Sequence, residues 1–229
     1  MNGEPLPYLL RTDSMVVFII FFCLILVVYI LLNGKRFLLY KLKALFRNSE
    51  RSGKYSDVTT DDAHYSFLLI LHACILWGVS IYIFLMNIFS ELTQSFSSYI
   101  LLGLICCIVF LLLLKCLMLS FINWVFFDKV RNTIWIKTYY NIFVWSGLLL
   151  LPIVLLVVFG NLSLDFFSYW VISVAIFMKI VLFFKYFNNF FNNFHGCFHL
   201  ILYLCTLEIL PDILLWKTIW VTSHFLLQL

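Results

Sequence analysis

The sequence contains six long runs of apolar residues, and these runs restrict the possible folds of the chain more than any other feature. The first run covers residues 15–32 and contains no charged side chain. A helix of about 20 apolar residues is long enough to cross the hydrocarbon core of a bilayer. We predict a span in this run and in each of the other five, at residues 65–89, 99–127, 139–159, 166–187 and 196–216.

The composition agrees with a membrane-embedded chain. Of the 229 residues, 64% are hydrophobic and only 11% are charged, whereas a soluble domain has about 45–50% apolar and about 25% charged residues. These values exclude a soluble enzyme, a nucleic-acid-binding protein and a disordered chain. We therefore predict an all-α fold, in which residues 1–229 form a single polytopic transmembrane helical bundle.

The basic residues in the predicted loops predict the orientation of the bundle. Eleven of them fall on one side of the membrane and two on the other. The first side carries Lys35, Arg36, Lys41, Lys43, Arg47, Arg51, Lys54, Lys129, Arg131, Lys137 and Lys185, and the second carries Arg11 and Lys217. Lysine and arginine are enriched in cytoplasmic loops of membrane proteins. The first side is therefore predicted to be cytoplasmic, and both termini are predicted to lie on the outer, periplasmic side.

The predicted cytoplasmic loop at residues 33–64 begins with a basic amphipathic segment. Leu38, Leu42 and Leu45 would share one stripe of a helix, and Arg36, Lys43 and Arg47 another. Such a segment, just inside the membrane, can lie along anionic lipid headgroups. The candidate headgroup contacts are Lys35, Arg36, Lys41, Lys43 and Arg47. Alternatively, these residues serve only as an orientation signal.

Three ionisable residues lie well inside the predicted spans: Lys115, Lys179 and Glu208. A charged side chain at the centre of a membrane helix costs about 2.5–3.5 kcal/mol on insertion scales, so such residues usually face the bundle and pair with one another. Lys115 lies ~20 Å of helix from the loop residue Asp128, and Glu208 lies ~18 Å from Gly196. The two charges are therefore at similar depths, and we predict that they form an ion pair.

Small residues accompany these charges at helical spacing, which is typical of contacts between membrane helices. Lys115 shares a stripe with Gly103, Cys107 and Leu111; Lys179 with Ser168, Ile172 and Ala175; and Glu208 with Cys197, Ile201, Cys205 and Asp212. Lys115, Lys179, Glu208 and Asp212 are thus the candidate intramembrane charge network. This network could fix helix register only, or it could carry protons or a substrate.

No arrangement of residues in the sequence is typical of a catalytic site. His195 and His199 share a helical face, but no carboxylate or third ligand accompanies them in the pattern of a metal site. All seven cysteines lie in apolar runs, where cysteine usually behaves as a small hydrophobic residue. We therefore predict no catalytic residue, no metal and no cofactor.

Several strings resemble a known family: WVFFDK at 124–129, NTIWI at 132–136, His195-Gly196, LYLCTLEILP at 202–211 and LLILHACILW at 68–77. Together they are similar to an uncharacterised family of integral membrane proteins of Gram-negative bacteria, known only as a domain of unknown function. The resemblance implies a multi-pass protein of the bacterial inner membrane with no assigned activity or ligand.

The sequence and the resemblance favour a non-enzymatic structural or assembly component of a membrane complex. Its expected partners are the lipid bilayer and either another membrane protein or a second copy of the chain, with no nucleic acid. The alternative is a small transporter or proton-coupled carrier that uses Lys115, Lys179 and Glu208.

Overall fold

The computed structural model describes residues 13–46, 60–88, 90–126, 129–160 and 162–190, together with Ile213 and Lys217. The regular structure in these ranges is α-helical: α1 (Ser14–Asn33), α2 (Lys35–Phe46), α3 (Thr60–Ile88), α4 (Ser90–Phe126), α5 (Lys129–Phe159) and α6 (Leu164–Phe190). All of these helices except α2 are long and apolar enough to cross a membrane. The predicted all-helical, multi-pass membrane fold is confirmed. The predicted sixth span, residues 196–216, lies outside the described ranges.

Two helices extend well beyond the apolar runs that predicted them. α4 begins at Ser90 and α5 at Lys129, about three turns before the predicted spans at 99–127 and 139–159. Extending an existing helix adds one backbone hydrogen bond for each residue that is fixed. The polar residues at the start of α4 and α5 can therefore continue each helix outside the hydrocarbon core. α5 also continues through Pro152, which is exposed within the helix.

The turn between α1 and α2 is short because one glycine makes it. The N–H of Gly34 donates to the carbonyl of Ile30 (2.7 Å), and the N–H of Leu38 donates to the carbonyl of Gly34 (3.0 Å). A Cβ at position 34 would lie 3.4 Å from the ring of Tyr65 on α3. The chain can therefore turn closely against α3, and α2 starts one residue after the membrane span ends.

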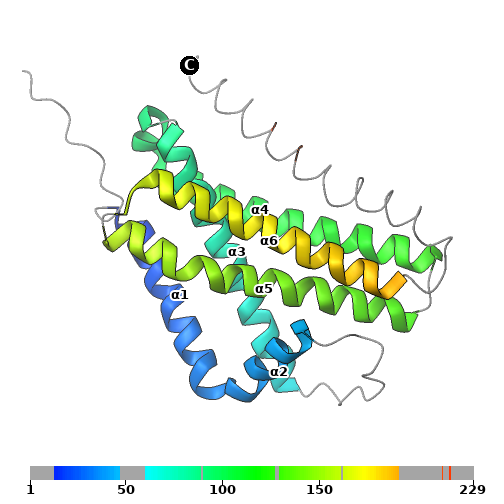
Figure 1. Cartoon of the computed structure of the whole chain (residues 1–229). Coiled ribbons are helices and arrows are strands. Elements are labelled where there is room, and N and C mark those ends of the chain that lie inside the picture. Colours follow the sequence, from blue (N-terminus) through cyan, green and yellow to red (C-terminus); the bar gives the residue numbers. More distant parts are fainter. Residues whose placement is uncertain are drawn as a thin grey trace, which may run out of the picture.

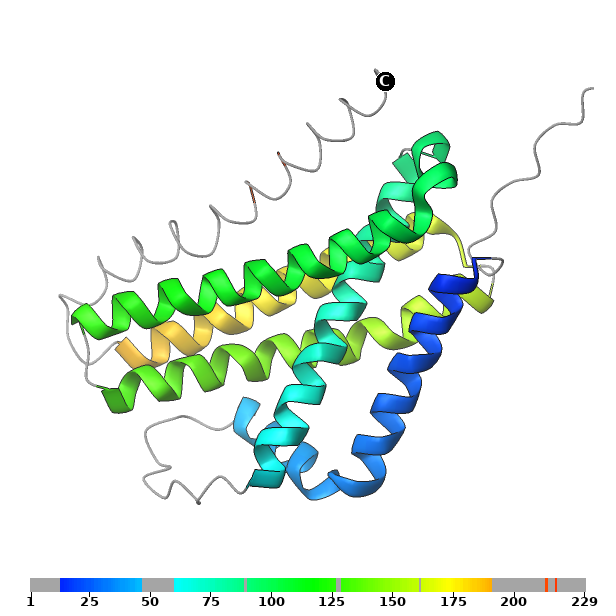
Figure 2. The same cartoon turned by 180° about the vertical axis from the view of Figure 1, so that it is seen from behind.

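The helices are arranged in two groups that cross each other (Figures 1 and 2). α4, α5 and α6 run side by side, and α1 and α3 cross them at a steep angle. α2 folds back from the end of α1 and contacts α5. α3 is the central element, because it contacts α1, α4, α5 and α6.

The central position of α3 depends on small residues at its two closest contacts. A Cβ built on Gly147 of α5 would lie 2.6 Å from both Cα and Cβ of Ala73, and a Cβ on Gly78 would lie 2.7 Å from Cγ1 of Ile105 on α4. Membrane helices use small residues in this way to let their backbones approach closely. Any larger side chain at these positions would push the helices apart.

The contact between α3 and α5 predicts the effect of a single methyl group. We expect Gly147→Ala to lower the melting temperature of the full chain in detergent by about 2–12 °C, because overpacking costs about 1–3 kcal/mol. The new Cβ would collide with backbone and Cβ atoms of Ala73, which have little freedom to move. Thermal unfolding followed by circular dichroism measures the shift.

Gly103→Ala is the matched control, because a Cβ at Gly103 on α4 meets no atom within 4 Å. Its melting temperature should equal or exceed that of the wild type, since alanine favours helix more than glycine does. Equal losses in the two variants would contradict the close approach of α3 and α5.

Candidate functional site

Polar side chains buried in the described part of the bundle are few, and they are the natural candidates for function. They are His72, Ser80, Lys115, Asn141 and Ser146. Both serines donate to carbonyls of their own helices: Ser80 to Leu76 (2.7 Å) and Ser146 to Phe143 (2.7 Å). Their hydroxyl donors are thus satisfied locally.

Two polar contacts connect α5 to its neighbours. The indole Nε1–H of Trp77 on α3 donates to Oγ of Ser146 (3.0 Å). Nearer the start of α5, Tyr140 and Cys116 of α4 form a side-chain hydrogen bond. These contacts brace the three central helices against one another.

Lys115 lies on the inward face of α4. Its side chain is only 9% exposed, and Leu112 and Leu119, one turn to either side, pack in a core cluster with residues of α3, α5 and α6. Lys179 is half-buried on α6, next to the buried Met178. Glu208 and Asp212 lie outside the described residues, so the ion pair between Lys115 and Glu208 stays a prediction.

The small-residue stripe predicted on the third span does not face the bundle along its whole length. Gly103 and Cys107 are exposed, while Lys115 is buried. An α-helix turns about 40° further with every four residues, because it has 3.6 residues per turn. Over the twelve residues from Gly103 to Lys115 the stripe turns by about 120°. The two ends of the stripe therefore face different surroundings.

Among the residues that the structure describes, three side chains contain buried polar atoms that make no hydrogen bond. They are both ring nitrogens of His72, Oδ1 of Asn141 and Nε1 of Trp145. His72 is fully buried and lies one turn after Leu69 on α3, while Asn141 and Trp145 lie one turn apart on α5. In the sequence, His72 can be recognised as a polar residue within the apolar run at residues 65–89. The run alone does not show that the side chain is completely buried.

α2 presents two distinct faces. Phe37 and Leu38 pack against a core cluster formed by Ile30, Leu69 and Val144, and the side-chain amide of Asn141 on α5 donates to the backbone carbonyl of Lys41 (3.0 Å). α2 is therefore fixed to the bundle by both apolar packing and a hydrogen bond. Leu38, the first leucine of the predicted apolar stripe, therefore faces protein.

The candidate headgroup contacts on α2 differ in how far their side chains are exposed. Lys35, Arg36 and Lys43 are exposed, whereas Lys41 is half-buried with its Nζ 5.0 Å from the centre of the Phe37 ring. Burial lowers the pKa of Lys41 to about 8. Arg47 lies outside the described residues. Lys41 thus belongs to the packed face of α2, whereas Lys35, Arg36 and Lys43 belong to its exposed face.

Within the described ranges, no three His, Cys, Asp or Glu side chains are grouped so that they could hold a metal ion. His195 and His199, the pair considered from the sequence, lie outside these ranges.

Comparison with protein families gave one match. A family described as a domain of unknown function, DUF4271, matches residues 16–219. The match begins at the second residue of the first predicted span and ends after the last predicted span. The chain belongs to the DUF4271 family. The resemblance to an uncharacterised domain family is thereby confirmed, and the DUF4271 match includes all of α3 to α6. Neither the search of curated proteins nor the search of solved structures found a match to the chain.

The buried position of Lys41 in this DUF4271 chain predicts a specific dependence of stability on pH. The folded protein loses the Lys41 proton at about pH 8, whereas lysine ordinarily has a pKa of 10.5. Between these values the unfolded chain binds more protons, so stability rises with pH. We expect Lys41→Met to remove this rise and to increase the melting temperature at pH 7 by about 2–4 °C.

Lys43→Met is the control, since Lys43 is exposed on the same helix. Melting temperatures measured from pH 6.5 to pH 10, in half-unit steps, test the prediction. A wild-type curve that stays parallel to the Lys41→Met curve would show that Lys41 is not buried as described.

Proposed function

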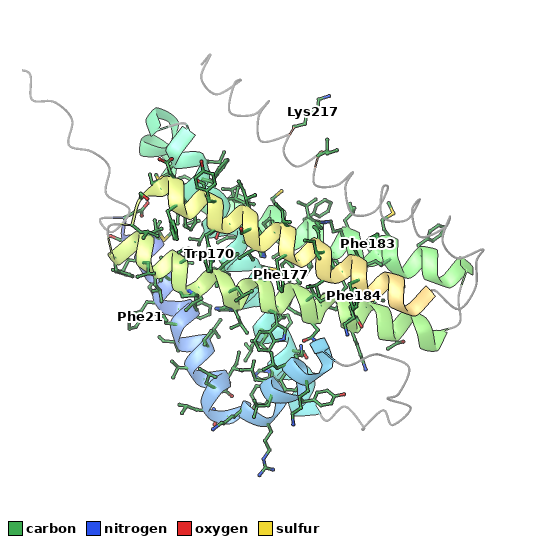
Figure 3. The ribbon with its side chains drawn as sticks, viewed as in Figure 1. Phe21, Trp170, Phe177, Phe183, Phe184 and Lys217 are labelled. Atoms are coloured by element: carbon green, nitrogen blue, oxygen red, sulfur yellow. The ribbon has the colours of Figure 1, made fainter. Side chains whose placement is uncertain are left out.

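We propose that this DUF4271 protein is a non-enzymatic structural or assembly component of a membrane complex. The observation that supports the proposal best is the outward face of α6. Trp170, Phe177 and Phe184 repeat at seven-residue spacing and are 39%, 53% and 61% exposed. Figure 3 shows these aromatic residues following one another along α6.

A second column runs beside the first. Tyr169, Ile176 and Phe183 have the same spacing and are also exposed. Seven-residue spacing keeps large side chains aligned along one side of a helix, which is the pattern that packs against another helix. Aromatic residues are also the most frequent energetic anchors of protein interfaces. The two columns therefore suit a helix of another membrane protein or of a second copy.

The interior of the bundle is consistent with a structural role. Two large apolar clusters fill the space between α3 and its neighbours, one with residues of α1, α4, α5 and α6 and the other with residues of α4, α5 and α6. The contacts of Trp77 with Ser146 and of Cys116 with Tyr140 brace helices within or beside these clusters. Polar side chains with these contacts contribute to the rigidity of the bundle.

A transporter is the second candidate, and the burial of Lys115 favours it. An ionisable residue inside a span often marks a route for ions or protons. In this alternative, Lys115, Lys179 and Glu208, with Asp212 on the same stripe as Glu208, would carry the proton or bind the substrate. The pairing of Lys115 with Glu208 is part of both proposals and can be tested separately.

We place the protein in the inner membrane of a bacterium, with both termini on the periplasmic side. The eleven basic residues on one side of the predicted spans support this orientation. In this orientation the turn between α1 and α2 lies at the cytoplasmic surface.

The proposed contact face of α6 predicts an effect on association. We expect the double variant Phe177→Ala, Phe184→Ala to reduce the amount of partner protein, or of second copy, that co-purifies with each chain in mild detergent. The reduction should be at least about tenfold, since anchor residues of an interface contribute about 2 kcal/mol or more. Cross-linking in membranes before extraction, followed by quantitative mass spectrometry, measures the amount per chain.

Phe21→Ala is the matched control, because Phe21 is 63% exposed on α1, away from α6. It should leave association unchanged. A wild-type chain that is recovered as a monomer without partner, or an equal loss with Phe21→Ala, would refute the structural role proposed for α6.

The ion pair predicts non-additive losses of stability. We expect Lys115→Met and Glu208→Gln each to lower the melting temperature by about 2–4 °C, and the double variant to recover part of the loss. Couplings in membranes are small, about 0.6 kcal/mol on average for hydrogen bonds, so each variant needs replicate scans. Lys179→Met combined with Glu208→Gln is the control. Additive losses for Lys115 and Glu208 would exclude a direct pair.

A further inference from the structure

The outward face of α2 combines positive charge with exposed apolar side chains. Its exposed residues are Lys35, Arg36, Leu39, Tyr40 and Lys43. At 100° per residue these five positions fall within an arc of about 140° on the helix. Leu39 is 49% exposed and Tyr40 is 61% exposed. Cations and apolar groups therefore alternate on a single surface.

This surface is held rigidly. Phe37 on the opposite face lies 6.1 Å from the ring of Tyr65 on α3, centre to centre, and Asn141 of α5 holds the backbone of α2 at Lys41. A site built on a fixed helix needs less ordering when a ligand binds than a site on a free loop.

The position of α2 indicates which ligand this surface meets. Gly34 alone separates α2 from the end of the first span, so α2 begins at the edge of the hydrocarbon core. Tyrosine is enriched at this level of the membrane, with its ring near the acyl chains and its hydroxyl near water. Leu39 and Tyr40 are exposed where lipid headgroups meet acyl chains.

The positive charge of this surface is not balanced by its own segment. Between Asp13 and Glu50 the sequence contains no acidic residue. Basic residues next to a span attract anionic lipids, with a gain of about fivefold in binding for each charge near the surface.

We propose that the outward face of α2 is a binding site for anionic phospholipid. Lys35, Arg36 and Lys43 contact the lipid phosphates, and Leu39 and Tyr40 enter the boundary between headgroups and acyl chains. Lys41 takes no part in this site, because it faces the bundle. The site does not depend on whether the protein is a structural component or a transporter.

Lipid binding to the purified full chain in a nonionic detergent tests the proposal. Native mass spectrometry is used to measure how much phosphatidylglycerol or phosphatidylcholine stays bound as each lipid is titrated. The wild type should bind phosphatidylglycerol in preference to phosphatidylcholine. The triple variant Lys35→Gln, Arg36→Gln, Lys43→Gln should weaken phosphatidylglycerol binding by about 100-fold, since three charges are removed.

Single substitutions provide the matched comparison. Arg36→Gln should weaken phosphatidylglycerol binding by about fivefold. Lys129→Gln, which removes a cation about 10 Å of helix before the apolar window that begins at Ile136, should change it by less than about twofold, because a charge at that distance is largely screened by salt. Equal losses in both variants, equal affinity for the two lipids, or full binding by the triple variant would each overturn the proposal. Circular dichroism checks that the variants keep their helices.

A second measurement locates the lipid. A photoreactive amino acid in place of Tyr40 should cross-link phosphatidylglycerol in vesicles, and the same group in place of Lys129, about 10 Å of helix before the apolar window of α5, should not. Cross-linking of phosphatidylglycerol only at position 129 would show that the lipid lies elsewhere on the protein.

Discussion

The close approach of α3 to α5 is the contact on which the rest of the bundle depends. Lipid tails are as apolar as the helices, so burial of apolar surface adds little to the association of helices inside a bilayer. Close packing of the helices therefore has to supply most of the free energy of association. Gly147 and Ala73 let the two backbones come close enough for such packing. The bond from Trp77 to Ser146 forms across the same two helices, and α1, α4 and α6 then add to this pair.

The sequence was sufficient to locate the five spans that the structure describes, but it did not show which residues of these helices contact one another. Long apolar runs determine spans almost regardless of context, because a bilayer admits few other structures. Which small residues meet another helix depends on rotation about each helix axis, and a drift of about 40° every four residues is enough to move a stripe out of contact. Thus Gly103, which was predicted to lie at a helix contact because it shares a stripe with Lys115, faces outward. Gly78 and Gly147, which share no predicted stripe with a charged residue, form the close contacts.

The candidate sites show the same division. The basic residues of α2 could be recognised from their position after a span, but the inward rotation of Lys41 depends on Asn141, which is 100 residues later in the chain. Long-range contacts of this kind have no local signature. Similarly, His72 could be recognised as polar within an apolar run, whereas its full burial follows from the central position of α3.

The length of α4 has a mechanical consequence. Its 37 residues correspond to about 55 Å of helix, whereas the hydrocarbon core is about 30 Å thick. The segment at residues 90–98 therefore continues the helix outside the apolar window that starts at Tyr99, without a break in its backbone hydrogen bonding. A protein that binds this projecting end would be coupled through a continuous helix to the segment of α4 that carries Lys115 inside the membrane.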